Sequence, residues 1–222
     1  MVNTDKYKSI VEELNGKATL VAVSKTKPAE DIKELYEIGH RDFGENYVQE
    51  LTEKQSKLPA DIRWHYIGHL QSNKVKYIAP FVFLIHGVDS LKLLKEIGKQ
   101  AEKNDRTIDC LLQIHIAQEE TKFGLDADEL QSLLDQFQQL QHPHVRIRGL
   151  MGMASFTHDM EKVKAEFQYL KTLFDKYAGL AINNCEFTIL SMGMSSDYQL
   201  AVREGSTMVR VGSLIFGERQ YS

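Results

Sequence analysis

Two lysines directly follow a short apolar run near the start of the chain. The stretch ATLVAVSKTKPAE begins at residue 18; its apolar run at residues 20–23 is typical of a buried strand, and Lys25 and Lys27 come next. Lysine is rarely buried without a partner, so a lysine at the end of a core strand indicates a functional amine. A neutral lysine amine attacks carbonyl carbons, and partial burial beside a second cation makes the neutral form easier to reach.

The alternation of the strand separates the two lysines. Lys25 shares the phase of Val21 and Val23. Lys27 precedes Pro28, which favours an extended loop conformation. We therefore expect Lys25 to be the reactive amine. The alternatives at this point are Lys27 itself, and a lysine that only contacts a phosphate or lies along the surface.

Two later stretches are suited to binding an anion. Residues 191–197 read SMGMSSD and residues 210–213 read RVGS; both combine serine hydroxyls with glycine, which lets the backbone approach a ligand. We expect the serines of the first stretch also to cap the following helix, whose free N–H groups favour an anion. The residues concerned are Gly193, Ser195, Ser196, Arg210, Gly212 and Ser213. Because glycine and serine also form ordinary turns, the support for a phosphate site comes from the two stretches together.

A reactive lysine and a phosphate site in one protein favour a particular kind of cofactor. Pyridoxal 5′-phosphate (PLP) has an aldehyde that forms a Schiff base with lysine and a phosphate that anchors its far end. Lys25 and the two anion-binding stretches would serve these two ends if the fold brings them together. A phosphate-binding enzyme without PLP is the alternative.

The rest of the sequence alternates between apolar, β-branched runs and longer segments of helical period. We expect strands at residues 19–23, 42–43, 63–67, 82–86, 108–116, 145–150, 187–190 and 208–211. We expect helices at residues 5–14, 29–38, 47–57, 73–78, 91–103, 128–139, 159–177 and 196–204. Strands joined by helices in this way predict an α/β fold, a parallel (β/α)8 TIM barrel, with the extra N-terminal helix against its floor or side. An open, doubly wound sheet is the alternative.

A closed barrel also predicts where the chemistry lies. Active sites of such barrels lie at the carboxyl ends of the strands, and phosphate often binds in the loops after strands seven and eight. Lys25 follows the first expected strand, and the two anion-binding stretches follow the seventh and eighth. No proline-rich or glycine- and serine-rich linker divides the chain, so we expect a single domain over residues 1–222.

The composition argues against several other classes of protein. The chain has 222 residues and a formal net charge of -4, which disfavours nucleic-acid binding because that needs a basic face. No apolar run reaches the roughly 20 residues of a membrane span, and the N-terminus reads as an amphipathic helix and not as a signal peptide. Cys110 and Cys185 have no CxxC partner and read as free thiols of a reducing compartment. We therefore expect a cytoplasmic protein.

The histidine spacing does not indicate a metal site. His65 and His69 are four residues apart in WHYIGH, which on a strand keeps the two side chains far from each other. A third ligand at a suitable spacing is not evident. Trp64, beside them, is expected to pack in the core or the barrel wall.

Six motifs occur in order along nearly the whole chain. They are AVSKTKP, FGENYVQE, WHYIGHLQSNK, RGLM, LSMGMSSD and STMVRVGSLIFGER. Together they resemble the pyridoxal phosphate homeostasis protein family, whose members are single-domain relatives of the alanine racemase barrel. The resemblance implies a fold-type III PLP barrel.

The resemblance also implies roles for particular residues. Lys25 would be the Schiff-base lysine. Ser195, Gly212 and Ser213 would bind the phosphate, and Arg210 would face the pyridine nitrogen. These roles agree with the reading of the lysine and of the two anion-binding stretches.

Two further positions follow from the same resemblance. Asn46 of GENYVQE would lie beside the cofactor. The sequence departs from the family pattern at His115, where asparagine is expected, and this puts in doubt any role carried over to that position. We expect His115 to be a strand histidine without a catalytic role.

Two classes of function follow from these expectations. The first is a PLP-binding protein of intracellular PLP homeostasis that carries or buffers the cofactor, with indirect effects on amino-acid and keto-acid pools. The second is a PLP-dependent amino-acid racemase of weak or narrow activity. Racemases of this type take a second acid–base group from a tyrosine on an additional C-terminal domain. The sequence ends at Ser222, so we expect no such domain and no appreciable turnover.

The expected partners are small molecules and cofactor-accepting enzymes. They are PLP, other B6 vitamers and apo PLP enzymes, with no nucleic acid and no membrane. Without a domain that reaches across a dimer, a monomer is expected.

Overall fold

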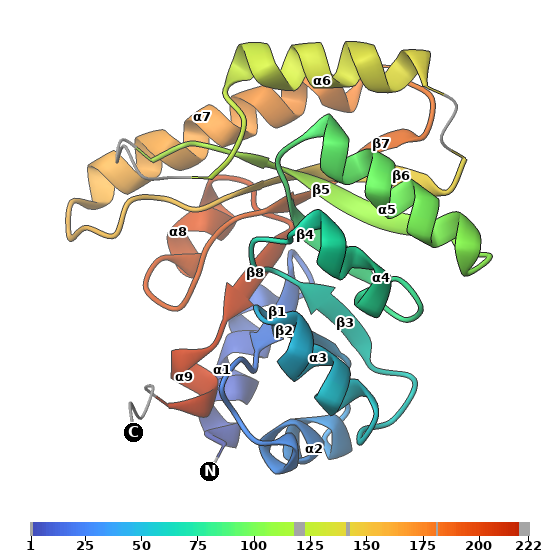
Figure 1. The fold of residues 1–222 in the computed structure, drawn as a ribbon. Helices are drawn as coiled ribbons and strands as arrows, with labels where there is room; N and C mark the ends of the chain where they lie inside the picture. The colour runs from blue at the N-terminus through green and yellow to red at the C-terminus, as the bar shows by residue number, and fades with distance from the viewer. Residues whose placement is uncertain (1, 118–122, 141–142, 181, 218–222) are drawn as a thin grey trace.

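Eight parallel strands close into a barrel in the order in which they occur along the chain (Figure 1). The computed structural model describes residues 2–117, 123–140, 143–180 and 182–217. The strands are β1 (Thr19–Val23), β2 (Asp42–Glu45), β3 (Arg63–Tyr66), β4 (Leu84–Val88), β5 (Ile108–Ile114), β6 (Val145–Gly152), β7 (Cys185–Ser191) and β8 (Met208–Val211). Because β8 pairs with β1, the predicted closed barrel is confirmed and the open sheet is wrong.

Helices connect the strands and cover the outside of the barrel. They are α1 (Thr4–Leu14), α2 (Ala29–Glu37), α3 (Val48–Gln55), α4 (Val75–Ile78), α5 (Leu91–Lys103), α6 (Ala127–Gln139), α7 (Met160–Ala178), α8 (Tyr198–Arg203) and α9 (Ser213–Phe216), with a short 3₁₀ helix, η1 (Ser72–Lys74), before α4. In Figure 1, α6 and α7 lie together over β5 to β7. Parallel neighbours need such crossover connections, which is why strand and helix alternate.

Apolar side chains fill the barrel interior as well as the layer between strands and helices. One buried cluster consists of residues from five different strands that contact one another: Val21, Leu84, Leu111, Met151 and Met208. Side chains from strands around the whole barrel can meet only in its interior. Since side chains alternate along a strand, Val23 and Lys25 follow Val21 on the interior side.

The element boundaries differ from the predicted ones by a few residues. β2 continues to Glu45 because Gly44 and Glu45 still pair with β3. β4 begins at Leu84, two residues after the predicted start, and the predicted helix at 73–78 is divided into η1 and α4. The sequence did not indicate α9, since four residues are too few to show a helical period.

The N-terminal helix lies against the side of the barrel and not under its floor. The Asn3 N–H donates to the Ile215 carbonyl in α9 at 2.8 Å. The Tyr198 hydroxyl at the start of α8 donates to the Glu13 carboxylate at 2.6 Å. α1 therefore holds the two short helices that follow β7 and β8, the strands that lead to both anion-binding stretches.

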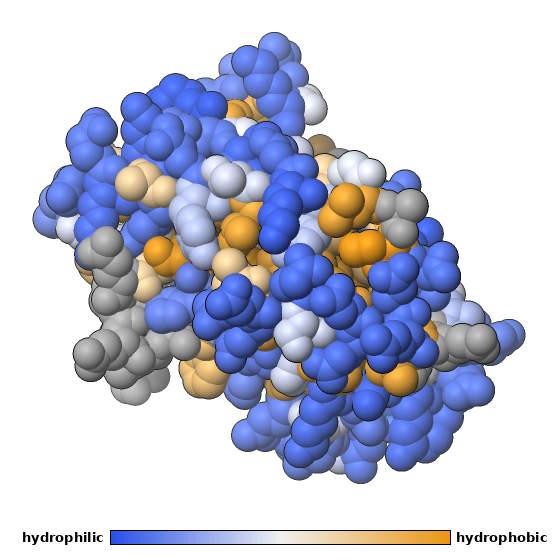
Figure 2. Space-filling view, turned by 90° about the horizontal axis from the view of Figure 1, so that it is seen from above, coloured by the Kyte–Doolittle hydropathy of each residue, from blue (hydrophilic) through white to orange (hydrophobic). Residues whose placement is uncertain are grey.

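The described surface is mainly polar. Figure 2 shows one face on which hydrophilic side chains dominate and apolar ones form smaller patches. Within the described ranges, no helix combines the length and apolar character needed to cross a membrane. Glu218 and Arg219, the last two residues of the closing motif, lie outside the described residues.

Candidate cofactor site

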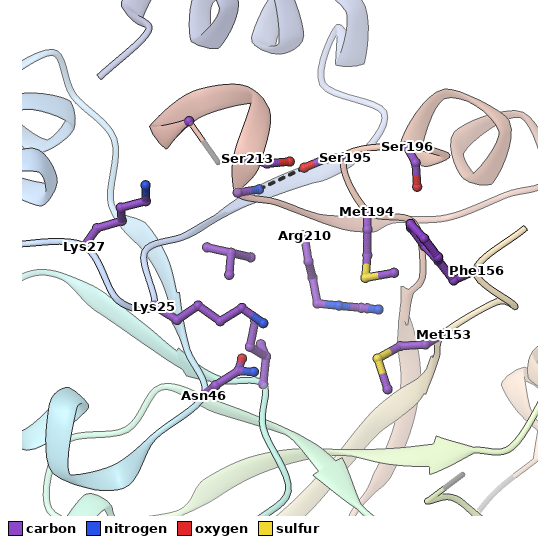
Figure 3. A pocket seen from close by; sticks show the side chains of 14 residues that line it. Lys25, Lys27, Asn46, Met153, Phe156, Met194, Ser195, Ser196, Arg210 and Ser213 are labelled. Atoms are coloured by element: carbon purple, nitrogen blue, oxygen red, sulfur yellow. Dashed lines mark hydrogen bonds between the residues drawn. The ribbon is translucent and has the colours of Figure 1, made fainter. Parts of the chain in front are cut away.

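A cavity of about 420 Å³ opens at the carboxyl ends of the strands. The described residues that line it lie at the ends of β1 and β8 or after β1, β2, β3, β6, β7 and β8. They include all six of the predicted site residues, Lys25, Asn46, Ser195, Arg210, Gly212 and Ser213. Figure 3 shows how Lys25, Asn46, Ser195, Arg210 and Ser213 surround the cavity. The barrel thus brings together Lys25 and Ser213, which are separated by most of the chain.

Lys25 and Lys27 reach the cavity from one turn. The Lys27 N–H donates to the Ser24 carbonyl at 3.0 Å, which closes the turn over Lys25 and Thr26. In Figure 3 the Lys25 amine points into the cavity beside Asn46, whereas Lys27 lies at the cavity edge. The direction of Lys25 into the cavity is the one that the strand phase predicts.

A buried ion pair lies directly behind this turn. Glu45 is fully buried, and its Oε1 accepts from the Ser24 hydroxyl at 2.6 Å and from the Lys54 ammonium at 2.7 Å. Burial raises the pKa of Glu45 to about 7, against the opposing effect of the Lys54 charge. The pair fixes the end of β2 and therefore the next residue, Asn46. Asn46 Oδ1 is buried and has no hydrogen-bond partner among the described residues, so it is ready to accept from a ligand.

Ser195, Gly212 and Ser213 form what we call the anion pocket. The Gly212 N–H donates to Ser195 Oγ at 3.2 Å (Figure 3). Gly193, which leads into the first stretch, has a φ of 94°, a left-handed conformation that glycine adopts at little steric cost. A Cβ at Gly212 would lie 3.0 Å from the Val23 carbonyl oxygen, so glycine permits the close approach of β8 to β1 here.

The serines of the first stretch do not cap α8. Its N-cap residue is Asp197, which makes no side-chain cap hydrogen bond. The Asp197 carboxylate accepts instead from the Met194 N–H at 2.6 Å. The predicted capping role of Ser195 and Ser196 is therefore wrong, because the helix begins two residues later than expected. Both hydroxyls line the cavity.

Arg210 presents a fixed cation to the cavity. Its side chain is buried, and its Nη1 donates to the Ser191 carbonyl at 2.9 Å and to Ser191 Oγ at 2.7 Å. Its Nη2 donates to the Gly152 carbonyl at 3.0 Å. Burial lowers the pKa of Arg210 to about 10, and the nearby Asp197 charge opposes this shift. The guanidinium therefore remains charged at neutral pH.

A chain of hydrogen-bonding groups leads from Arg210 into the barrel interior. Ser191 Oγ lies 3.2 Å from His86 Nδ1. His86 Nε2 lies 3.0 Å from His65 Nδ1, and His65 Nε2 lies 3.0 Å from Asp42 Oδ1. The chain thus connects the cavity with the amino-terminal end of β2.

The protonation states along this chain follow from burial. Burial acts to raise the pKa of Asp42, but hydrogen bonds from Arg63 and His65 hold it well below its usual range, so Asp42 is ionised. Burial lowers the pKa of both His65 and His86, so both are neutral. A neutral imidazole has one donor and one acceptor. His65 must then donate to Asp42, His86 to His65, and the Ser191 hydroxyl to His86, which leaves Ser191 Oγ to accept from the guanidinium.

Several of these residues were not identified from the sequence. Asp42, His86 and Ser191 support Arg210 from three different strands, and the sequence does not show which side chains meet inside a barrel. His65 belongs to this chain, whereas His69 stacks on Phe123 with ring centroids 4.4 Å apart. The two histidines of WHYIGH therefore lie in different surroundings.

The charges around the cavity suit an anionic ligand. Among the described lining residues, the charged side chains are Lys25, Lys27 and Arg210, and none is a carboxylate. The anion pocket adds two hydroxyls, one of which accepts from the Gly212 N–H, and the unpartnered Asn46 oxygen adds an acceptor. A small molecule with a phosphate at one end and a lysine-reactive aldehyde at the other fits this set of groups, and PLP is such a molecule.

Comparisons with known proteins identify the family of the chain. The family described as alanine racemase, N-terminal domain, matches residues 3–220. The pyridoxal phosphate homeostasis protein of Aquifex aeolicus is 42% identical over 205 residues, which cover 92% of this chain and 88% of that protein. Structures of PipY from Synechococcus elongatus PCC7942 without PLP and with PLP bound are 38% and 37% identical, with TM-scores of 0.89 and 0.87, and cover 96% of this chain and 99% of PipY.

A more distant structure shares the fold alone. Alanine racemase from Bartonella henselae, with covalently bound pyridoxal phosphate, is 16% identical and has a TM-score of 0.69. The comparison covers 94% of this chain and 56% of the racemase. The fold and the position of the cavity therefore define a barrel of the alanine racemase N-terminal type. Within this class, the chain belongs to the pyridoxal phosphate homeostasis protein family, as its six motifs predict.

Proposed function

We propose that this chain binds PLP through a covalent bond to Lys25 and holds it for supply to other proteins, as a part of PLP homeostasis. The observation that supports this most is that one cavity contains both the Lys25 amine and the anion pocket. The names of the relatives and the structure of PipY with PLP bound support the same function.

The predicted site residues then have defined parts in binding. Bound PLP supplies an aldehyde for the lysine amine and a phosphate that anchors its far end. Lys25 provides the amine. The Ser195 and Ser213 hydroxyls donate hydrogen bonds to the phosphate, the Gly212 N–H orients Ser195 Oγ, and Asn46 lies beside the ring.

Arg210 would determine how strongly the cofactor ring withdraws electrons. A guanidinium donates hydrogen bonds and does not give up its proton in a protein, so facing the ring nitrogen it leaves that nitrogen unprotonated. The ring is then a weaker electron sink than one paired with a carboxylate. Ser191 and Gly152 hold the guanidinium in place. This arrangement favours a carrier over an enzyme that stabilises carbanions.

The titratable groups around the cavity also favour a carrier. Racemisation needs two acid–base groups on opposite faces of the substrate carbon. The titratable side chains among the described lining residues are Lys25, Lys27 and Arg210. Lys27 lies at the edge (Figure 3), and Arg210 stays protonated. A racemase of weak or narrow activity is the second candidate, because Lys25 alone can serve one face.

We propose further that the chain acts as one PLP-binding domain and as a monomer in the cytoplasm. The support for this is that all six predicted site residues of the chain line one cavity. Other B6 vitamers are additional ligands on this proposal, and apo PLP enzymes are the recipients.

The supply role predicts that the loaded protein restores activity to an apo PLP enzyme. The measurement is the recovery of that enzyme's activity in the presence of a phosphatase that destroys free PLP. Protein whose cofactor has been fixed by borohydride is the control, since it cannot release PLP. Recovery no faster than with the fixed control would contradict a role in supply.

The anion pocket predicts unequal effects of its two neighbouring serines. Ser195→Ala should weaken PLP binding about tenfold, because the loss of one charge-assisted hydrogen bond has about this effect on affinity. Ser196→Ala should change it far less, since Ser196 is exposed and only Ser195 contacts the Gly212 N–H. Fluorescence titration with PLP measures both. Equal and negligible effects would mean that the phosphate binds elsewhere.

A further inference from the structure

One buried lysine, Lys54 of α3, holds the backbone next to Lys25. Its ammonium donates to the Ser24 carbonyl at 2.8 Å, to Glu45 Oε1 at 2.7 Å and to Glu50 Oε1 at 2.6 Å. An ammonium has three donors, so these three acceptors use all of them. Lys54 is 6% exposed, which is rare for a lysine unless it is paired. Its position is therefore fixed by the groups around it.

Glu50 connects Lys54 to Thr26, the residue that follows Lys25. The Thr26 N–H donates to Glu50 Oε1 at 2.6 Å, the same oxygen that accepts from Lys54. Thr26 has a φ of 63°, which is unfavourable for a β-branched residue. A positive φ at the third position of a turn normally requires glycine or asparagine. A threonine in this conformation needs an external contact to hold it, and Glu50 provides that contact.

The conformation of this turn determines which amine enters the cavity. Lys25 and Lys27 both line the cavity and lie on either side of Thr26. The turn is closed by the Lys27 N–H on the Ser24 carbonyl, which is also an acceptor of Lys54. A change at Thr26 would rotate the two lysines relative to the cavity. Two amines thus compete for one aldehyde, and the backbone between them decides the outcome.

We infer that Lys54, acting through Glu50 and Ser24, is a positioning residue that directs Lys25 instead of Lys27 to the cofactor. This inference rests on the proposed function and adds to it the origin of the selectivity between two neighbouring lysines. Lys54 does so from behind the turn, since it is not among the described residues that line the cavity.

The test measures which lysine bonds to PLP. Wild type, Glu50→Gln, Lys54→Met and the control Glu53→Gln are saturated with PLP and reduced with borohydride, and peptide mapping gives the ratio of pyridoxyl label on Lys27 to that on Lys25. Glu53 is a matched control because it is on the same helix and lines the same small pocket beside the turn as Glu50, but its carboxylate accepts from Gln49 and not from the turn. A general loss of stability would lower both labels without changing their ratio.

The ratio should rise about tenfold in Glu50→Gln and Lys54→Met and stay at the wild-type value in Glu53→Gln, because each variant of the first pair weakens a charge-assisted contact of the turn. Lys54→Met leaves Glu45 buried without its cation and can fail to fold. In that case the label ratio of Glu50→Gln decides whether the inference holds. An unchanged ratio in folded Glu50→Gln overturns the inference and leaves the proposed function intact. An absence of label from the wild type overturns the proposed function itself.

Discussion

Lys25→Ala is expected to abolish the covalent attachment of PLP. After incubation with PLP and reduction with borohydride, the wild type should carry one pyridoxyl group per chain and the variant close to none. The reason is geometric, since the Lys25 amine points into the cavity and Lys27 lies at its edge. Affinity should fall by at least about 100-fold, more than the roughly tenfold effect of one lost hydrogen bond, because the anion pocket alone then holds the cofactor. Mass spectrometry and PLP titration measure the two effects.

Lys27→Ala is the matched control, because both lysines line the cavity and differ in direction. It should keep the label on Lys25 and retain the yellow colour of the bound cofactor. Full labelling of Lys25→Ala, or a wild-type label found on Lys27, would show that Lys25 is not the reactive amine and that the prediction from the strand phase is wrong.

The parts of the site that were predicted without the family resemblance share one physical basis. The period of two along β1 connects Val21 in the barrel interior to Lys25 at the cavity, and this needs no knowledge of other strands. The closed barrel then brings the loops after β7 and β8 to the same end. Local pattern and fold class were sufficient to find Lys25, Ser195 and Gly212 around one cavity.

The parts that the sequence did not predict depend on contacts between distant segments. Asp42, His65 and His86 meet because β2, β3 and β4 are neighbours at a particular register, and single-sequence patterns do not give register. Lys54 appears in the sequence as one charge on an amphipathic helix, yet it is buried against Ser24. Only the packing of α3 against β2 and the turn after β1 shows its partners.

The prediction that Ser195 and Ser196 cap α8 was wrong for a local reason. Serine is a frequent N-cap residue, and the helix was expected to start beside it. Asp197 occupies the cap position instead, and its carboxylate binds the Met194 N–H within the loop. The loop after β7 is thus shaped by its own acidic residue, which leaves both serine hydroxyls at the cavity.

Racemisation at the rate of a dedicated enzyme is not expected from this site. A proton must leave one face of the substrate carbon and another must arrive at the opposite face. Lys25 can serve one face, but the other titratable groups among the described lining residues are Lys27 at the edge and a buried Arg210 that stays protonated. General acid–base catalysis contributes roughly 10²–10⁴-fold, so a missing second group should reduce turnover by about that factor. The weak electron sink that Arg210 imposes on the ring should reduce it further.

The measurement is a chiral assay of common amino acids in deuterated water with the PLP-loaded protein. We expect slow exchange at the α-carbon, if any, and almost no inversion of configuration. The Lys25→Ala variant gives the background for both signals. Rapid deuterium incorporation with inversion, lost in Lys25→Ala, would restore the racemase as the function, and it would require a second acid–base group that acts at the opposite face of the substrate. Because Lys27 is the nearest such amine, Lys27→Ala would then be the variant that identifies it.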